Sequence, residues 1–169
     1  MALNFLRTPE GSLRPAAKGA AAATGAWLTI AITFVAGFEG FYSKAYLDPV
    51  HVRTICYGQT ADDGADFSKT YTKAECMKML GQDLTKYDAM VKSCVKVPLP
   101  PHREAALVSF TYNLGQGALC HGAVARKLNA GDVPGGCKAI LAYNHAGGRV
   151  LRGLTNRRQA EFKMCLRND

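Results

Sequence analysis

The feature that most constrains this chain is a run of uncharged residues near its N-terminus. Residues 19–38, GAAAATGAWLTIAITFVAGF, contain no charged side chain. As a helix, a run of this length extends about 30 Å, which matches the hydrocarbon core of a bilayer. Basic residues precede the run at Arg7, Arg14 and Lys18, and none follows it until Lys44. This asymmetry predicts a membrane-spanning segment with its N-terminal flank in the cytoplasm.

The composition of the run makes it a weak anchor. Ala, Gly and Thr fill most of its positions, and strongly apolar side chains begin only at Trp27. Such a helix can engage the export machinery yet gains little from staying in lipid. Two other interpretations remain open. One is a cleaved signal peptide, with its best cleavage match near residues 35–37, and the other is a helix in the core of a soluble protein.

The sequence therefore predicts three parts. These are a basic cytoplasmic segment (residues 1–18), a releasable transmembrane segment (residues 19–38) and an exported folded domain (residues 39–169). Hydrophobic residues make up 48% of the 169 residues and charged residues 20%, so the chain is neither disordered nor fibrous. The exported part is long enough to bury one core.

The cysteine content and the net charge limit the possible cellular compartments and binding partners of this chain. The 6 cysteines are an even number, which fits disulfides in an oxidising compartment, although six buried thiols in a reduced chain are the alternative. Their spacing shows no zinc-binding pattern, so no metal and no cofactor is expected. The net charge of +8 favours an anionic partner. Nucleic acid is disfavoured, because no recognition motif accompanies the charge and the export segment points outside the cell.

The remaining pattern predicts a mostly helical α+β domain. Turn residues and β-formers at 42–60 predict a small β-sheet lobe, followed by a polar loop at 61–70. A capping box at Thr72 and Glu75 opens a predicted helix that runs to about residue 95. Further predicted helices are 101–113, ended by Gly115 and Gly117, and then 121–129, 134–143 and 154–166.

The residues that carry chemistry follow the apolar run directly. Glu39 ends the apolar helix, Asp48 lies in a predicted turn, and Thr54 lies on the strand that follows. Partial desolvation at an apolar helix end favours a protonated carboxyl, which is what a general acid requires. A carboxylate in a polar turn stays ionised and can orient water together with a nearby hydroxyl. Taken alone, two carboxylates at this spacing more often cap helices or lie on the surface.

The complete string is much more specific than the pair. The pattern E-G-x(4)-A-Y-x-D-x(5)-T-x-x-Y-G-x-T, from Glu39 to Thr60, resembles the phage lysozymes of glycoside hydrolase family 24. The segments 106–115, 126–132 and 153–161 resemble later motifs of that family in the same order. The weak apolar helix before the glutamate resembles that of signal-anchor-release endolysins. The resemblance implies a lysozyme-like fold and a muramidase that cleaves the MurNAc-(β1→4)-GlcNAc bonds of peptidoglycan.

The same resemblance implies a role for individual residues. Glu39 is expected to protonate the leaving oxygen, and Asp48 with Thr54 to position water. Substrate contacts are implied at Thr60, Tyr112 and Asn113. Three disulfides are implied: Cys94–Cys120, Cys137–Cys165 and, for the two cysteines that remain, Cys56–Cys76. Arg157 and Arg158 either contact the anionic wall polymer or form ion pairs with Glu161 and Asp132 inside the fold.

Two functions remain in competition. The first is a monomeric endolysin that lyses a Gram-negative host, is held inactive in the inner membrane and becomes soluble in the periplasm. The second is a membrane-anchored peptidoglycan-binding scaffold with an inactive lysozyme fold. The intact set of Glu39, Asp48 and Thr54 favours the enzyme. Two departures from the family pattern, His51 in place of glycine and Gln59 in place of histidine, concern fine contacts and leave the reaction class unchanged.

Overall fold

The computed structural model describes residues 20–48 and 51–169, with side chains from residue 25 onward. The predicted basic segment at 1–18 lies outside the described residues. The helices are α1 (Ala20–Glu39), α2 (Lys73–Cys94), α3 (Pro101–Leu114), α4 (Gln116–Cys120), α5 (Ala123–Asn129), α6 (Val133–Ala139) and α7 (Arg152–Cys165). The strands are β1 (Tyr42–Leu47), β2 (Arg53–Cys56), β3 (His145–Ala146) and β4 (Arg149–Val150), and two 3-10 turns are η1 (Ala61–Asp63) and η2 (Ile140–Ala142).

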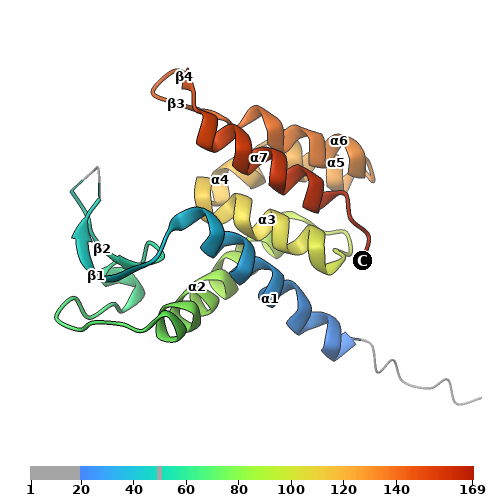
Figure 1. The fold of residues 1–169 in the computed structure, drawn as a ribbon. Coiled ribbons are helices and arrows are strands. Elements are labelled where there is room, and N and C mark those ends of the chain that lie inside the picture. Colours follow the sequence, from blue (N-terminus) through green and yellow to red (C-terminus); the bar gives the residue numbers. More distant parts are fainter. Residues whose placement is uncertain (1–19, 49–50) are drawn as a thin grey trace, which may run out of the picture.

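Helix α1 contains most of the uncharged run and belongs to the core of the folded domain. Trp27, Ala31 and Val35 recur every four residues, and all three are buried against the core. Their spacing places them on one face of the helix. That face packs on α2 and α3, so α1 lies alongside both in Figure 1. In the part of the chain with described side chains, residues 25–48 and 51–169, no helix is long and apolar enough to cross a membrane.

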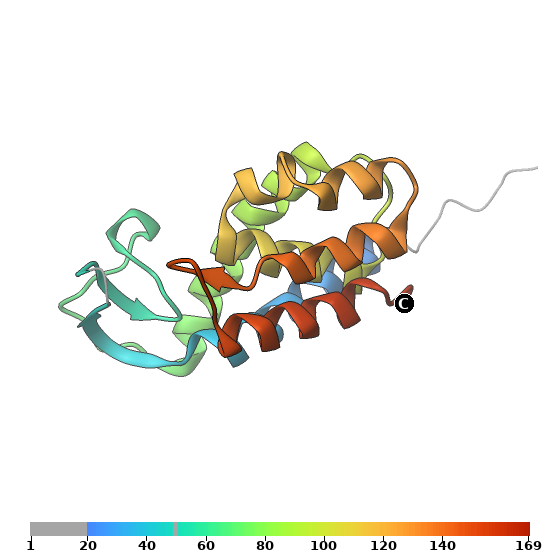
Figure 2. The same cartoon turned by 90° about the horizontal axis from the view of Figure 1, so that it is seen from above.

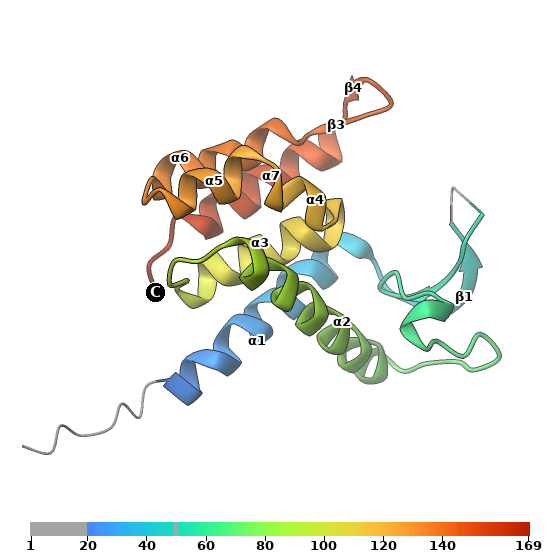
Figure 3. The same ribbon diagram turned by 180° about the vertical axis from the view of Figure 1, so that it is seen from behind.

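Helix α3 is the centre of the helical body. Most of its length is buried, including Leu107 and Phe110, because other helices cover it on two sides. Helices α1 and α2 pack on one side and α7 on the other, as seen from behind in Figure 3. This central position explains why the sequence of α3 shows little amphipathic pattern: a helix surrounded by protein is apolar on several faces.

The small β-sheet lobe forms where the sequence predicts it. Strands β1 and β2 pair antiparallel, with Tyr46 opposite Thr54 and Tyr42 opposite Cys56, and the register is irregular between the two tyrosines. This unit projects from one end of the helical body in the view from above in Figure 2. The predicted α+β, mostly helical architecture with a β lobe near 42–60 is confirmed.

A local capping signal sets the start of α2. At the start of α2, the backbone N–H of Glu75 donates to Thr72 Oγ1 at 3.3 Å, and the N–H of Thr72 donates to Glu75 Oε2 at 2.8 Å. This reciprocal capping box confirms the predicted start. Ion pairing with Lys69 and these hydrogen bonds lower the pKa of Glu75 to about 2.

Several elements differ from the sequence prediction. Helix α5 begins at Ala123 and not at residue 121, and α7 begins at Arg152 and not at residue 154. Gly115 ends α3 as expected, but Gly117 lies inside the short helix α4. The helix predicted at 134–143 begins at Val133 and ends at Ala139, after which the backbone tightens into η2. The hairpin of β3 and β4 was not predicted, because two-residue strands are too short to show alternation.

All three implied disulfides are present. The Cα–Cα distances are 5.1 Å for Cys56–Cys76, 5.2 Å for Cys94–Cys120 and 5.6 Å for Cys137–Cys165. The first bridge ties the β lobe to α2, the second ties α2 to α4, and the third ties α6 to α7. The bridges therefore join elements that are distant in sequence but packed together.

His51 occupies a backbone conformation that suits glycine. Its φ angle is 63°, in the left-handed region where a Cβ atom is unfavourable. We expect His51→Gly to raise the free energy of unfolding by about 0.5–1 kcal/mol, measured by urea denaturation with the disulfides intact. Lys44→Gly, at an exposed position of β1, is the matched control and should lower stability by a similar amount. An unchanged or lower stability for His51→Gly would contradict an unfavourable backbone conformation at His51.

Candidate active site

Glu39 is the last residue of α1, at the junction of the helical body and the β lobe. Its side chain is 24% exposed, and its Oε1 forms an ion pair with Arg157 Nη1 of α7 at 2.5 Å. The other oxygen, Oε2, accepts no hydrogen bond from the described residues. The carboxyl group is therefore held through Oε1 and lines the cavity described below.

Arg157 is itself fixed by a buried network. Its Nε lies 3.2 Å from Glu161 Oε1, and Ser109 Oγ donates to the same oxygen at 2.8 Å. Arg158 pairs with Glu161 at 2.7 Å and donates to Asn113 Oδ1 at 2.9 Å. The predicted pairing of the two arginines with Glu161 is confirmed.

The predicted pairing with Asp132 is wrong. Asp132 caps α6 by accepting a hydrogen bond from the backbone N–H of Gly135, and Lys127 is its ionic partner. A sequence without tertiary contacts cannot rank the acidic residues available to an arginine, and the helix cap is the local use of this aspartate.

A cavity of about 420 Å³ opens beside Glu39. It brings together four of the predicted site residues, Glu39, Thr60, Tyr112 and Asn113. The remaining lining residues, which sequence reasoning did not single out, are Gly58, Asp62, Asp63, Asp83 and Tyr87. The lining is rich in carboxylates and hydroxyls, which are groups that can accept and donate hydrogen bonds to a polyhydroxyl ligand.

Tyr112 fixes the wall of the cavity. Its hydroxyl donates to the carbonyl of Tyr57 at 2.9 Å, which links α3 to the β lobe. Burial, followed by the charges of Glu39 and Asp83, raises the pKa of Tyr112, so the hydroxyl remains a donor. At Gly58, whose φ is +107°, a Cβ atom would lie 3.3 Å from this hydroxyl. Glycine therefore allows both the turn and the close approach of Tyr112.

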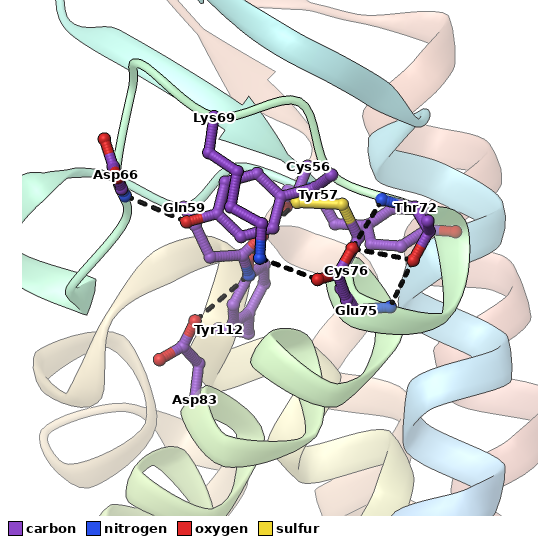
Figure 4. The surroundings of a disulfide bond; sticks show 11 residues. Cys56, Tyr57, Gln59, Asp66, Lys69, Thr72, Glu75, Cys76, Asp83 and Tyr112 are labelled. Atoms are coloured by element: carbon purple, nitrogen blue, oxygen red, sulfur yellow. Dashed lines mark hydrogen bonds and ion pairs between the residues drawn. A yellow bond between two sulfur atoms is a disulfide. The ribbon is translucent and has the colours of Figure 1, made fainter.

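Gln59 joins the two lobes below the cavity. Its Nε2 donates to Asp83 Oδ2 at 3.0 Å, and its Oε1 accepts from the backbone N–H of Tyr57 at 2.9 Å, as Figure 4 shows. Gln59 is only 1% exposed. Gln59, which stands where the family pattern has histidine, therefore connects the β lobe to α2. An amide satisfies both partners without carrying a charge into the interior.

Asp48 and Thr54 lie on the β lobe and are not among the residues that line the cavity. Asp48 Oδ1 accepts a hydrogen bond from the N–H of Val52 at 2.8 Å, as expected for a carboxylate in a turn. Thr54 is 4% exposed, and its hydroxyl donates to the carbonyl of Val52 at 3.1 Å. Both side chains therefore bond to the backbone of Val52, Asp48 to its N–H and Thr54 to its carbonyl.

No metal centre is evident in the described part of the chain. Groups of three or more histidine, cysteine, aspartate or glutamate side chains that could hold an ion are absent there. The 6 cysteines are all in disulfides.

Comparison with known proteins identifies the family. The family model described as "Phage lysozyme" matches residues 36–161, which include Glu39, the β lobe and the arginine network. The chain belongs to the phage lysozyme family. It is therefore a glycoside hydrolase, and the resemblance inferred from Glu39–Thr60 and the later motifs is confirmed.

The phage lysozyme relatives share most of the chain. A SAR-endolysin of Bacteriophage PS119 is 40% identical over 130 residues, covering 77% of this chain and 77% of the relative. A SAR-endolysin of Enterobacteria phage P21 is 38% identical over 130 residues, covering 77% and 78%. Among solved structures, a mutant of P22 lysozyme superimposes with a TM-score of 0.75 at 29% identity, covering 82% of this chain and 97% of that one.

Proposed function

We propose that this phage lysozyme is an endolysin of the signal-anchor-release type that hydrolyses MurNAc-(β1→4)-GlcNAc bonds and thereby lyses a Gram-negative host. The observation that supports an enzyme is the position of Glu39, a partly exposed carboxyl held by Arg157 at the edge of a polar cavity. A direct test is the release of reducing MurNAc ends from purified peptidoglycan. A scaffold with an inactive fold has no need for this arrangement, so the enzyme is favoured.

In the proposed mechanism Glu39 is the general acid. Arg157 holds Oε1, and Oε2 delivers a proton to the glycosidic oxygen as the bond to the leaving sugar breaks. Glycoside hydrolysis needs a second group on the other side of the sugar. Asp48 and Thr54 fill that role by orienting water and stabilising the oxocarbenium ion. Thr60, Tyr112 and Asn113 bind the glycan from the cavity wall.

The glycan strand then lies between the cavity and the β lobe. Gly40 connects Glu39 to β1 and has a φ of 74°, so the chain turns sharply at this joint. Because Asp48 and Thr54 follow this turn, the orientation of the β lobe relative to α1 determines how they face Glu39.

The proposed active enzyme is a monomer that needs no cofactor.

The proposed regulation follows from the position of Glu39 at the end of the uncharged run. While residues 19–38 span the inner membrane after export, Glu39 is held at the lipid surface and the site cannot assemble. Release is favoured by the Ala-, Gly- and Thr-rich composition, and it makes the enzyme soluble in the periplasm. No cysteine precedes Cys56, so a disulfide with the anchor itself is excluded as the switch. The SAR-endolysin relatives support this proposal.

The packing of α1 is consistent with the released form. Trp27, Ala31 and Val35 are buried in the domain, with exposed fractions of 5%, 0% and 0%. Apolar groups that contacted lipid before release would be covered by α2 and α3 afterwards. Burial in the domain keeps these groups out of water after release, so it lowers the free-energy cost of leaving the lipid.

A more apolar anchor is expected to block lysis. Replacing Ala20, Ala23, Gly25 and Ala26 with leucine should keep the protein in the membrane fraction and prevent host lysis, because each leucine favours the bilayer. At Gly25 a Cβ atom would meet no neighbouring atom within 4 Å, so this substitution fits the folded enzyme. The measurement is membrane partitioning and culture turbidity after depolarisation.

Serine at the same four positions is the matched control and should allow normal release. Lysis by the leucine variant on the normal schedule after depolarisation would contradict the release model. Recovery of wild-type protein cut near Gly37 would instead identify residues 19–38 as a cleaved signal peptide.

A further inference from the structure

Two tyrosines form a stacked pair on the surface of the β lobe. The ring centroids of Tyr42 and Tyr46 are 4.2 Å apart, with an angle of 34° between the ring planes. Both residues belong to β1, and the irregular register between them accompanies this close stacking. Tyr42 is 47% exposed, although a ring of this size gains most from burial. In the described chain, neither hydroxyl has a hydrogen-bond partner.

The pair lies beside the proposed catalytic carboxyls. A Cβ atom built on Gly40 would lie 3.6 Å from Tyr42 Cε2, so the Tyr42 ring rests against the residue that follows Glu39. Burial, together with the charges of Tyr42, Asp48 and Glu39, raises the pKa of Tyr46. Tyr42 follows Glu39 by three residues and Tyr46 precedes Asp48 by two, so β1 carries the pair between the two carboxyls along the chain.

We propose that the Tyr42–Tyr46 pair is a carbohydrate-stacking site that binds one pyranose ring of the glycan strand next to the scissile bond. This inference rests on the proposed function, since it assigns a substrate contact to the same site. The negative face of an aromatic ring attracts the weakly positive C–H groups on the flat face of a pyranose. The free hydroxyls at the ring edge can bond the sugar hydroxyls.

Exposure distinguishes Tyr42 from the aromatic residues of the core. Phe110 and Tyr57 are buried, and Tyr57 packs against Phe41, which is 42% exposed, with 5.8 Å between the ring centroids. Leu47 and Val52 are also exposed on the same unit, at 62% and 43%, but an aliphatic side chain offers no flat π surface. Leu47 therefore serves as a matched control: it is on the same strand and exposed, but it is not aromatic.

The test uses a soluble tetrasaccharide of alternating GlcNAc and MurNAc. Its binding to the Glu39→Gln protein, which should not cleave it, is measured by calorimetry. Adding Tyr42→Ala should weaken binding about tenfold, the effect expected when one ring is lost from an aromatic stack. Adding Tyr42→Phe should change binding less than about twofold, because the ring remains. Adding Leu47→Ala should also leave binding unchanged.

A kinetic measurement completes the test. In the otherwise wild-type enzyme, Tyr42→Ala should raise KM about tenfold with little change in kcat, since the ring binds ground state and transition state alike. Equal binding by the Tyr42→Ala protein and its parent, or an equal loss in the Leu47→Ala protein, would overturn the stacking site. Cleavage of the tetrasaccharide by the wild type tests the proposed function separately, so the two failures are distinguishable.

Discussion

Replacing Glu39 with glutamine is expected to lower the rate of peptidoglycan hydrolysis at least ~100-fold. The amide can still accept the hydrogen bond from Arg157 through its oxygen, so the fold should be preserved. It cannot supply the proton that the leaving oxygen needs. The rate is measured as the release of reducing ends from purified peptidoglycan, and folding is checked by thermal denaturation with the disulfides intact.

Asp62→Asn provides the control for Glu39→Gln. Asp62 lines the same cavity but belongs to η1 and has no proposed part in the proton transfer, so its neutralisation should change the rate only a few-fold. Near-normal hydrolysis by the Glu39→Gln protein would remove Glu39 from the mechanism. Asp48→Asn and Thr54→Ala should also lower the rate of hydrolysis. That loss would show that the β lobe takes part in the reaction.

Neutralising Glu161 is expected to cost the most stability. Glu161 is 0% exposed and pairs with Arg158, also 0% exposed, and with Arg157. In Glu161→Gln the guanidinium of Arg158 stays buried and loses its counter-ion, while Arg157 keeps Glu39. Removing one partner of a buried ion pair destabilises a protein by about 3–5 kcal/mol. Urea denaturation at neutral pH measures the loss.

An exposed ion pair is the matched control for this network. Lys69 and Glu75 are 2.7 Å apart, with side chains 48% and 41% exposed. Lys69→Gln should therefore cost less than about 1 kcal/mol. A loss below about 1 kcal/mol in the Glu161→Gln protein would contradict the role of Glu161 as the stabilising counter-ion of the buried arginines.

Local and periodic features were predictable from the sequence. The capping box at Thr72 and Glu75 is a contact between neighbours in the chain, and it begins α2 at the predicted position. The long helix α2 follows from residue periodicity, and the β lobe follows from turn residues and β-formers, neither of which needs knowledge of the partner element. The disulfides came from family resemblance alone, since six cysteines permit many pairings by spacing.

The structure places the predicted site residues in two groups. Glu39, Thr60, Tyr112 and Asn113 meet at one cavity, because the end of α1, the turn after β2 and the end of α3 converge there. Asp48 and Thr54 stand on the β lobe, outside that lining. The motif joins these residues in sequence, but the turn at Gly40 determines where the β lobe carries them.

The sequence by itself determined which residues are proposed for the chemistry, since Glu39 and the motif around it are contiguous in the chain. Tertiary structure alone decided what holds them. The contact of Arg157 with Glu39 spans 118 residues, and that of Gln59 with Asp83 spans 24. Neither leaves a periodic or local signal, because a long-range polar contact forms only after the apolar faces of α1, α3 and α7 have packed and brought the partners together.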